Sequence, residues 1–211
     1  MKILVCAATE MEIPDSIKKL REIQLLVHGV GAAQASYSLG RYLATNTPDL
    51  AIQIGIAGSY DPIIKIGEVV QVVSDRFALF GSEDKNGAIL HLADMSFITD
   101  FNPFTTKEIS SYKNLVLPGY AEVHVIPVIT ATGYQPTIDK MIELYHPQIE
   151  SMEGAPFFAA MKLNHVPCIQ LRAISNMVEP RNRDHWNIPF ALSALEKAIL
   201  YTLNQLNKSS Y

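Results

Sequence analysis

The stretch Ile169-Gln170-Leu171-Arg172-Ala173-Ile174-Ser175-Asn176 decides the fold that we predict for this chain. Its apolar residues favour a buried strand, and polar side chains gather toward its C-terminal end. In an open α/β sheet, ligands bind at the edge formed by the carboxyl ends of the strands. The preceding segment Ser151-Met152-Glu153-Gly154-Ala155 is expected to open a helix whose Glu points to the same edge. The sequence therefore predicts a crevice with a guanidinium, a carboxylate and an amide, which suits a sugar joined to a heterocycle.

Composition restricts the class of protein. With 211 residues, 48% hydrophobic and 18% charged, the chain fits a single domain over 1–211 with a substantial core. The formal net charge of −4 disfavours a nucleic-acid polymer or an anionic membrane as partner. Cys6 and Cys168 lie in apolar runs and are interpreted as buried thiols. We expect neither a metal nor a cofactor. Glu10 and Glu12 end the first apolar run too early for a signal peptide, so we predict a cytoplasmic protein.

Strands and helices alternate along the chain. Short apolar runs predict strands at 2–8, 25–27, 50–54, 68–73, 123–129 and 166–174, and helical patterns cover 32–45, 137–145, 153–163 and 189–206. This alternation predicts a single-domain, three-layer α/β/α fold with a central mixed, mostly parallel sheet. Residues 81–122, with Phe97, Phe101 and Phe104, are too irregular for a simple connection, so we interpret them as an active-site cover or an oligomer contact.

The loop after the first strand, Ala8-Thr9-Glu10-Met11-Glu12, carries two carboxylates. These acids either favour the first turn of a helix or include a general base. Since the loop has no Lys, Arg or glycine-rich cradle, it would repel a phosphate but could activate water.

Two glycine-containing segments also follow strands. His28-Gly29-Val30-Gly31 partly resembles a dinucleotide fingerprint, but Gln34 occupies the third glycine position, so packing glycines are favoured over NAD binding. Gly55-Ile56-Ala57-Gly58 either forms a tight strand–helix turn or lets a ligand approach the backbone.

Two charged residues in the second half of the chain complete the predicted crevice. Glu153 either accepts hydrogen bonds from two ribose hydroxyls or is an acid at a helix N-terminus. Arg172 needs a carboxylate partner if its strand is buried, and the candidates are Glu12 and the substrate.

Together these segments resemble the nucleoside phosphorylase and nucleosidase superfamily, in its hydrolytic branch. The resemblance covers nearly the whole chain and rests on ATEME at 8–12, GVGAAQAS at 29–36, IGIAGS at 54–59, GEVV at 67–70, SMEGA at 151–155 and RAISN at 172–176. The methylthioadenosine/S-adenosylhomocysteine nucleosidases are similar in all these segments. The stretch 172–188 most resembles the futalosine hydrolases, which release hypoxanthine from futalosine in menaquinone biosynthesis. Its marks are Arg172, Glu179, Arg181, Arg183, Trp186 and Ile188.

The resemblance implies roles around a purine nucleoside. Glu12 would be the general base that activates water, with Arg172 supporting it, and Glu153 and Met152 would bind the ribose. The remaining substrate-binding positions would be Ile56, Ala57, Gly58 and Ser175. In the nucleosidases, a serine at the place of Ile56 helps to hold the water, so this contact is missing here.

The resemblance also implies contacts beyond the ribose. The candidates for binding the carboxylate of the futalosine tail are Arg181, Arg183 and His185, and Trp186 could stack on its aryl ring. The alternative for this segment is a solvated basic loop anchored by one Trp. The superfamily further implies a homo-oligomer, with a dimer as the minimal unit, in which a neighbour's loop closes the pocket.

Asn176 bears on which base is bound, because the adenosine-type nucleosidases carry an Asp at this place. An amide group can donate to nitrogen 7 or to the oxo oxygen, which favours hypoxanthine or guanine over adenine. Unlike a protonated Asp, Asn176 cannot supply a proton to the leaving base. The alternative is that Asn176 caps a helix that follows Ser175.

Four functions stay open from the sequence. The leading one is hydrolysis of futalosine, and the second is hydrolysis of methylthioadenosine, S-adenosylhomocysteine or another purine nucleoside. Phosphorolysis is disfavoured by the acidic first loop. A catalytically silent purine-binding relative is disfavoured because Glu12 and Glu153 are both present.

Overall fold

The computed structural model describes residues 1–98, 102–111, 113 and 115–208. Its main sheet contains β1 (Ile3–Ala7), β2 (Ile23–Val27), β3 (Leu50–Ser59), β4 (Val69–Asp75), β7 (Ile109–Ser110), β8 (Ala121–Pro127), β9 (Ile149–Ser151) and β10 (Cys168–Met177). The helices are α1 (Asp15–Lys18), α2 (Ala32–Leu43), α3 (Gln135–Tyr145), α4 (Gly154–Leu163) and α5 (Ile188–Lys208). Short 3-10 turns lie at Glu10–Glu12, Leu92–Asp94 and Arg183–His185, and β5 (Gly81–Glu83) pairs with β6 (Ile89–His91) in a separate hairpin.

The strands of the main sheet follow the order β10-β4-β8-β9-β3-β1-β2, and β10 pairs with β3 as well. Because β10 contacts both β4 and β3, the strands from β10 to β3 close into a ring, and β1 and β2 extend the sheet beyond it. The pairs β1–β2, β1–β3, β3–β10, β4–β8 and β8–β9 are parallel, whereas β4–β10, β3–β9 and β4–β7 are antiparallel. The mixed, mostly parallel sheet predicted from the sequence is thus confirmed.

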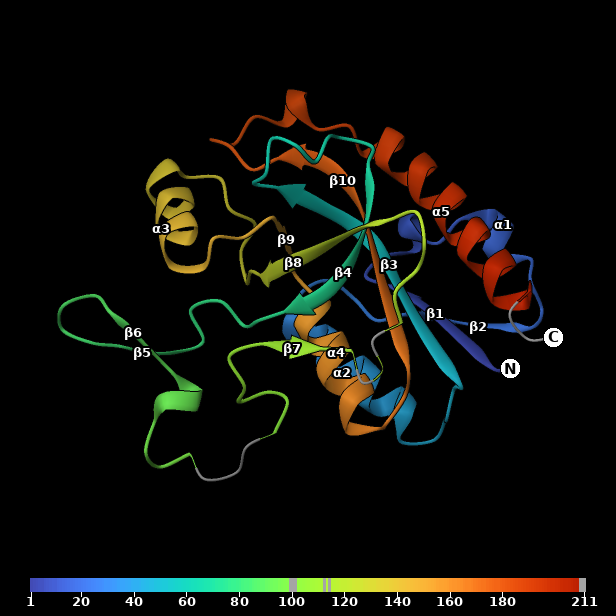
Figure 1. The fold of residues 1–211 in the computed structure, drawn as a ribbon, viewed down its shortest axis with the longest axis horizontal. Coiled ribbons are helices and arrows are strands. Elements are labelled where there is room, and N and C mark those ends of the chain that lie inside the picture. Colours follow the sequence, from blue (N-terminus) through green and yellow to red (C-terminus); the bar gives the residue numbers. More distant parts are fainter. Residues whose placement is uncertain (99–101, 112, 114, 209–211) are drawn as a thin grey trace.

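Both faces of the sheet are buried, which explains why its strands are apolar without interruption. In β1, Leu4 and Cys6 join the core cluster that contains residues of α2 and α4, whereas Ile3, Val5 and Ala7 join the cluster beneath α5. This two-residue alternation is the geometry of a strand. Figure 1 shows α5 and α1 on one side of the sheet and α2 and α4 on the other, so the predicted three layers are confirmed.

Several predicted boundaries differ from the structure. β3 continues through the small residues to Ser59, so the tight strand–helix turn considered for 55–58 is wrong. β10 continues to Met177, and no helix begins at Asn176, so the capping alternative for Asn176 is also wrong. The sequence did not indicate β9, which is only three residues long. In each case, hydrogen bonding to a neighbouring strand extends or creates a strand that the local pattern does not show.

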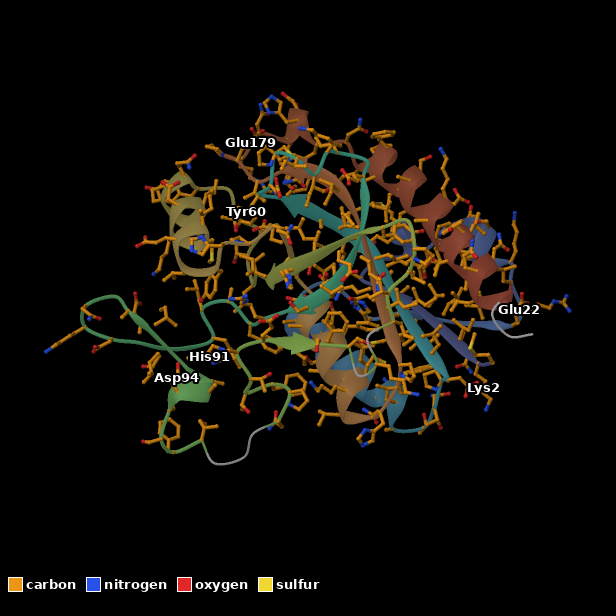
Figure 2. All side chains as sticks on the ribbon, viewed as in Figure 1. Lys2, Glu22, Tyr60, His91, Asp94 and Glu179 are labelled. Carbon is orange, nitrogen blue, oxygen red and sulfur yellow. The ribbon has the colours of Figure 1, made fainter. Side chains whose placement is uncertain are left out.

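The irregular segment 81–122 contributes strands at several places. β5 and β6 project away from the main sheet (Figure 1), and β7 adds to the edge of β4. Lys2 and Glu22 lie at one end of the molecule, and His91 and Asp94 lie at the end that carries this hairpin (Figure 2). Of the aromatic residues singled out there, Phe101 lies outside the described residues. Across the described part of the chain, no helix has the length and apolar character that a membrane span requires.

Candidate active site

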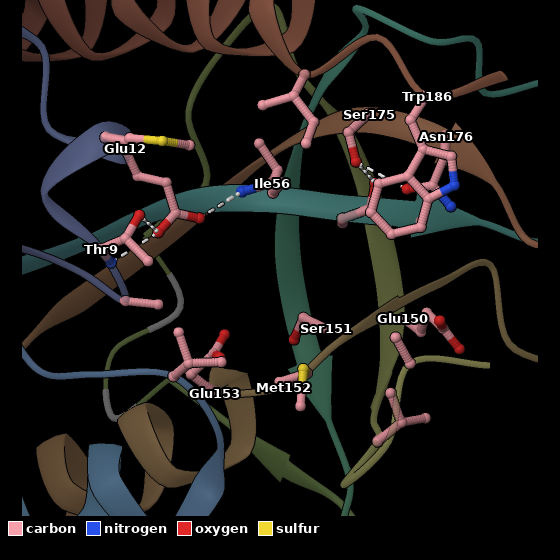
Figure 3. Close-up of a pocket in the computed structure, with 18 of the residues that line it drawn as sticks. Thr9, Glu12, Ile56, Glu150, Ser151, Met152, Glu153, Ser175, Asn176 and Trp186 are labelled. Carbon is pink, nitrogen blue, oxygen red and sulfur yellow. Dashed lines mark hydrogen bonds between the residues drawn. The ribbon is translucent and has the colours of Figure 1, made fainter. Parts of the chain in front are cut away.

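A cavity of about 230 Å³ lies at the C-terminal ends of β1, β3 and β10, beside the start of α4. Most of the predicted site residues line it, namely Glu12, Ile56, Ala57, Gly58, Met152, Glu153, Ser175, Asn176 and Trp186. Figure 3 shows Glu12 at one end of the cavity and Asn176 with Trp186 at the other. We call these the acidic end (Glu12, Glu153 and the adjoining Arg172) and the amide end (Asn176, Ser175, Trp186 and Glu150).

The Glu12 side chain is buried and held in one orientation. Its Oε2 atom accepts hydrogen bonds from the backbone N and the Oγ1 of Thr9, at 2.9 and 3.0 Å. Its Oε1 atom accepts from the backbone N of Ile56 at 3.1 Å. A carboxylate offers about four lone-pair positions, so these three bonds leave one position with which Glu12 can bind a water or a ligand hydroxyl.

Arg172 lies behind the cavity wall and is 1% exposed. Its Nη2 donates to Gln53 Oε1 at 2.9 Å, and its Nε donates to Gln170 Oε1 at 3.0 Å. Its Nη1 lies 3.9 Å from Glu153 Oε2. Among the described residues, Glu153 is therefore the carboxylate at ion-pair distance from Arg172. Of the two candidates named from the sequence, Glu12 does not fill this role, and the substrate stays a prediction.

Gly55 explains how Glu12 and Arg172 can lie near each other without a direct ion pair. A Cβ atom on Gly55 would lie 2.2 Å from Arg172 Nη1 and 3.0 Å from Glu12 Oε1. The backbone of β3 thus fills the gap between the two charged groups, and only a residue without a side chain fits there.

Glu153 joins α4 to the start of α2. Its Oε1 accepts a hydrogen bond from the backbone N of Gly31 at 2.9 Å, and Gly31 is the residue before α2. The N-terminal end of a helix is a favourable place for a carboxylate. Gly29 and Gly31 have φ of 88° and 86°, a conformation that favours glycine.

His28 extends the buried network away from the cavity. Gln53 Nε2 lies 3.0 Å from His28 Nε2, and His28 Nδ1 lies 2.9 Å from the carbonyl oxygen of Gly29. Burial lowers the pKa of His28, so the neutral ring accepts from Gln53 and donates to Gly29. The segment at 28–31 therefore supports the site by packing and hydrogen bonding.

At the amide end, the Asn176 side chain has a fixed orientation. Its Oδ1 accepts from Ser175 Oγ at 2.8 Å, and its Nδ2 donates to the carbonyl oxygen of Met177 at 3.0 Å. An amide NH₂ group has two donors, so one N–H stays available to a ligand. Asn176 thus presents a donor to the cavity.

The basic loop predicted to bind a tail lies at the same end. Trp186 lines the cavity, and the Arg181 guanidinium carbon lies 5.4 Å from the centre of its ring. Arg181 and Arg183 are exposed, and neither lines the cavity. The structure therefore brings Trp186 into the site but leaves both arginines outside it, so their role in tail binding stays a prediction.

The site predicted from the sequence lacked several residues that line the cavity, among them Glu150 and Ser151. Both belong to β9, the strand that the sequence pattern did not reveal. The Ser151 hydroxyl is buried and has no hydrogen-bond partner among the described residues, so a ligand can supply one. The sequence signal that could have indicated both residues is their position directly before Met152 and Glu153.

Comparison with known proteins identifies the family of this chain. The family model of the phosphorylase superfamily matches residues 16–203. A futalosine hydrolase of Streptomyces coelicolor is 31% identical over 183 residues, which cover 83% of this chain and 76% of that protein. A futalosine hydrolase of Acidothermus cellulolyticus is 31% identical over 188 residues, covering 87% and 76%. The chain belongs to the futalosine hydrolase family of the phosphorylase superfamily.

Solved structures show the same fold. A methylthioadenosine/S-adenosylhomocysteine nucleosidase of Colwellia psychrerythraea, in complex with adenine, matches with a TM-score of 0.77 and 15% identity, over 98% of this chain and 96% of that chain. A futalosine hydrolase mutant of Helicobacter pylori matches with a TM-score of 0.73 and 15% identity, over 96% and 98%. The resemblance predicted from the sequence is confirmed, and with it the expected class of enzyme, a hydrolase of N-glycosyl bonds.

Proposed function

We propose that this member of the family hydrolyses futalosine to hypoxanthine and dehypoxanthine futalosine. One observation carries the proposal: two complementary groups lie at opposite ends of one cavity (Figure 3). Glu12 is a buried carboxylate with one vacant acceptor position, and Asn176 has an available amide donor. The first group can activate water, and the second can bind the base that leaves.

In the proposed mechanism, a water bound to Glu12 attacks the anomeric carbon as the bond to purine nitrogen 9 breaks. Glu12 takes the proton of this water, and the bonding electrons leave with the base, which gains one proton in the overall reaction. The sugar carries positive charge in the transition state. Glu153 would bind the ribose hydroxyls, the Met152 side chain would pack on the sugar, and Arg172 would hold Glu153 in place.

The same cavity supports a preference for a 6-oxopurine. The free N–H of Asn176 matches nitrogen 7 or the oxo oxygen of hypoxanthine. The second candidate, a methylthioadenosine or S-adenosylhomocysteine nucleosidase, is favoured only by the likeness of the fold.

The test is an assay of purified protein on futalosine, inosine and methylthioadenosine, with and without phosphate, in which the released base is measured by chromatography. We expect fastest release from futalosine and no requirement for phosphate. Faster release of adenine would favour the second candidate, and a strict phosphate requirement would indicate phosphorolysis. A folded protein that turns over none of the three would instead be a binding relative.

We also propose that a second copy of the chain covers the groove next to the cavity. This groove has a volume of about 490 Å³, shares Val30 and Val128 with the cavity, and is lined by Phe77, Phe80 and Phe104. No described residue of 81–122 lines the cavity itself, whereas Phe104 lines the groove, which favours the oligomer contact over the active-site cover. Sedimentation velocity should show a dimer.

The predicted cytoplasmic location fits two buried cysteines kept as thiols, Cys6 and Cys168.

A further inference from the structure

We infer that Glu150 determines specificity for the base, by accepting a hydrogen bond from nitrogen 1 of a 6-oxopurine while Asn176 donates to the neighbouring edge. This inference rests on the proposed function, because it requires a purine in the cavity. It assigns a role to a carboxylate that the mechanism above does not use.

Glu150 lies at the amide end of the cavity. It belongs to β9, is 5% exposed and lines the cavity with Asn176. A Cβ atom on Gly58 would lie 3.1 Å from Asn176 Nδ2 and 3.5 Å from Glu150 Cγ. The two side chains therefore flank the same backbone position of β3, and Figure 3 shows them at the same end of the cavity, away from Glu12.

The hydrogen bonds of Glu150 fix its carboxylate and leave it one vacant acceptor position. Its Oε1 accepts from the backbone N of Thr132 at 2.9 Å, and its Oε2 accepts from Thr132 Oγ1 at 2.5 Å and from the Tyr60 hydroxyl at 2.8 Å. Three of about four lone-pair positions are therefore used. Burial and the nearby Glu150 carboxylate raise the pKa of Tyr60, so its hydroxyl keeps its proton and acts as a donor.

The two groups distinguish the purines by the pattern of donors and acceptors on the six-membered ring. A 6-oxopurine has an N–H donor at nitrogen 1 beside an oxygen acceptor at carbon 6. Adenine has the reverse, an acceptor at nitrogen 1 beside an amino donor. An acceptor from Glu150 and a donor from Asn176 match the first pattern, and against adenine they would oppose acceptor to acceptor and donor to donor. Such mismatches in a buried site are costly.

Protonation of Glu150 would change its side chain from a hydrogen-bond acceptor into a donor toward nitrogen 1. Burial raises the pKa of Glu150, although hydrogen bonds from Thr132 and Tyr60 oppose the shift. A protonated carboxyl group can donate to nitrogen 1 of adenine. The preference for hypoxanthine over adenine should therefore weaken as the pH falls through the raised pKa.

The first experiment compares Glu150→Gln with wild type on futalosine and its 6-amino analogue. The glutamine NH₂ group can donate to nitrogen 1, so we expect the ratio of kcat/KM for the 6-oxo over the 6-amino substrate to fall by roughly 10- to 100-fold. Glu143→Gln, an exposed change on α3, is the matched control and should keep the wild-type ratio. A folded Glu150→Gln protein with an unchanged ratio overturns the inference.

The second experiment uses only the wild-type protein, so it decides the question if the variant does not fold. Calorimetry gives the affinities for free hypoxanthine and adenine from pH 8 downward, staying above the pH at which adenine itself protonates. We expect the hypoxanthine preference to decrease toward low pH, and a constant preference contradicts the inference. Since this measurement needs no turnover, a protein inactive on futalosine that still shows the pH-dependent preference would refute the proposed function and leave the role of Glu150 intact.

Discussion

The two ends of the cavity differ in charge and in the way they are held together. At the acidic end, Glu12, Arg172 and Glu153 are all buried, and they come from three segments that are far apart in the sequence. At the amide end, Asn176 is held by its own neighbours, Ser175 and Met177, through short-range hydrogen bonds. The first end contains the Arg172–Glu153 ion pair, whereas at the second end local hydrogen bonds hold Asn176 and the more distant Thr132 and Tyr60 hold Glu150.

This difference follows the chemistry that each end would perform. A sugar that becomes cation-like is stabilised by carboxylates, so charge is placed at the acidic end despite the cost of burying it. A leaving base needs directed hydrogen bonds, which the Asn176 amide can donate and the Glu150 carboxylate can accept. Changes at the acidic end should therefore reduce the rate strongly, and changes at the amide end should alter the choice of substrate.

The largest effect is expected for Glu12→Gln. The amide is nearly isosteric but cannot take a proton from water, so kcat should fall by on the order of 10²- to 10⁴-fold. Substrate binding, measured by calorimetry, should change little. Glu10→Gln removes an exposed carboxylate from the same turn and should keep full activity. Equal rates for wild type and Glu12→Gln would remove Glu12 from the mechanism.

A paired glycine test compares the two ends directly. In Gly55→Ala, the new Cβ would lie 2.2 Å from Arg172 Nη1, so the buried guanidinium must move, and a rate loss of about 10²-fold is expected. In Gly58→Ala, the new Cβ would lie 3.0 Å from Val178 Cγ2 and 3.1 Å from Asn176 Nδ2, which requires shifts of only tenths of an ångström. Its rate loss should stay below about tenfold. Similar losses in both variants, by steady-state kinetics, would show that the ends are equally rigid.

At the amide end, Asn176→Asp should shift the preference toward 6-aminopurines. A protonated Asp can donate to nitrogen 7 and accept from the 6-amino group, so the 6-oxo to 6-amino ratio of kcat/KM should fall by about 10- to 100-fold. Asn86→Asp lies in an exposed turn and serves as the control. If the 6-oxo to 6-amino ratio of kcat/KM is the same in Asn176→Asp and wild type, Asn176 does not determine which base is recognised.

The smallest effect concerns stability behind the acidic end. Burial raises the pKa of Asp75, although the Arg76 backbone N–H and the charge of Arg172 oppose the shift. Because the folded-state pKa lies above the unfolded-state value, the contribution of Asp75 to stability is full below the unfolded-state pKa and is lost as the pH rises through the folded-state pKa.

Asp75→Asn removes this titration, so the free energy of unfolding should fall less with rising pH in that range than in wild type. Urea denaturation at several pH values measures the difference. Asp139→Asn, an exposed change on α3, should keep the wild-type slope. An unchanged slope in Asp75→Asn would mean that Asp75 is ionised in the folded protein throughout.

Much of the site could be predicted because its chemistry lies where apolar strands end. Glu12 follows β1, the small residues 55–58 end β3, and Ser175 with Asn176 ends β10, so the rule for open α/β sheets brings them to one edge. Glu150 could not be found in this way, because β9 is too short to give a periodic pattern and is formed only by pairing with β3 and β8.

The sequence by itself determined the layered α/β fold, the family and many of the residues that line the cavity, because strand periodicity and local motifs depend on residues close together in the chain. The tertiary structure alone decided which groups interact. It pairs Arg172 with Glu153 and not Glu12, inserts Gly55 between the two charges, and sets Glu150 beside Asn176. These contacts depend on strand register and on side-chain rotamers, which are set by packing between segments that are distant in the sequence.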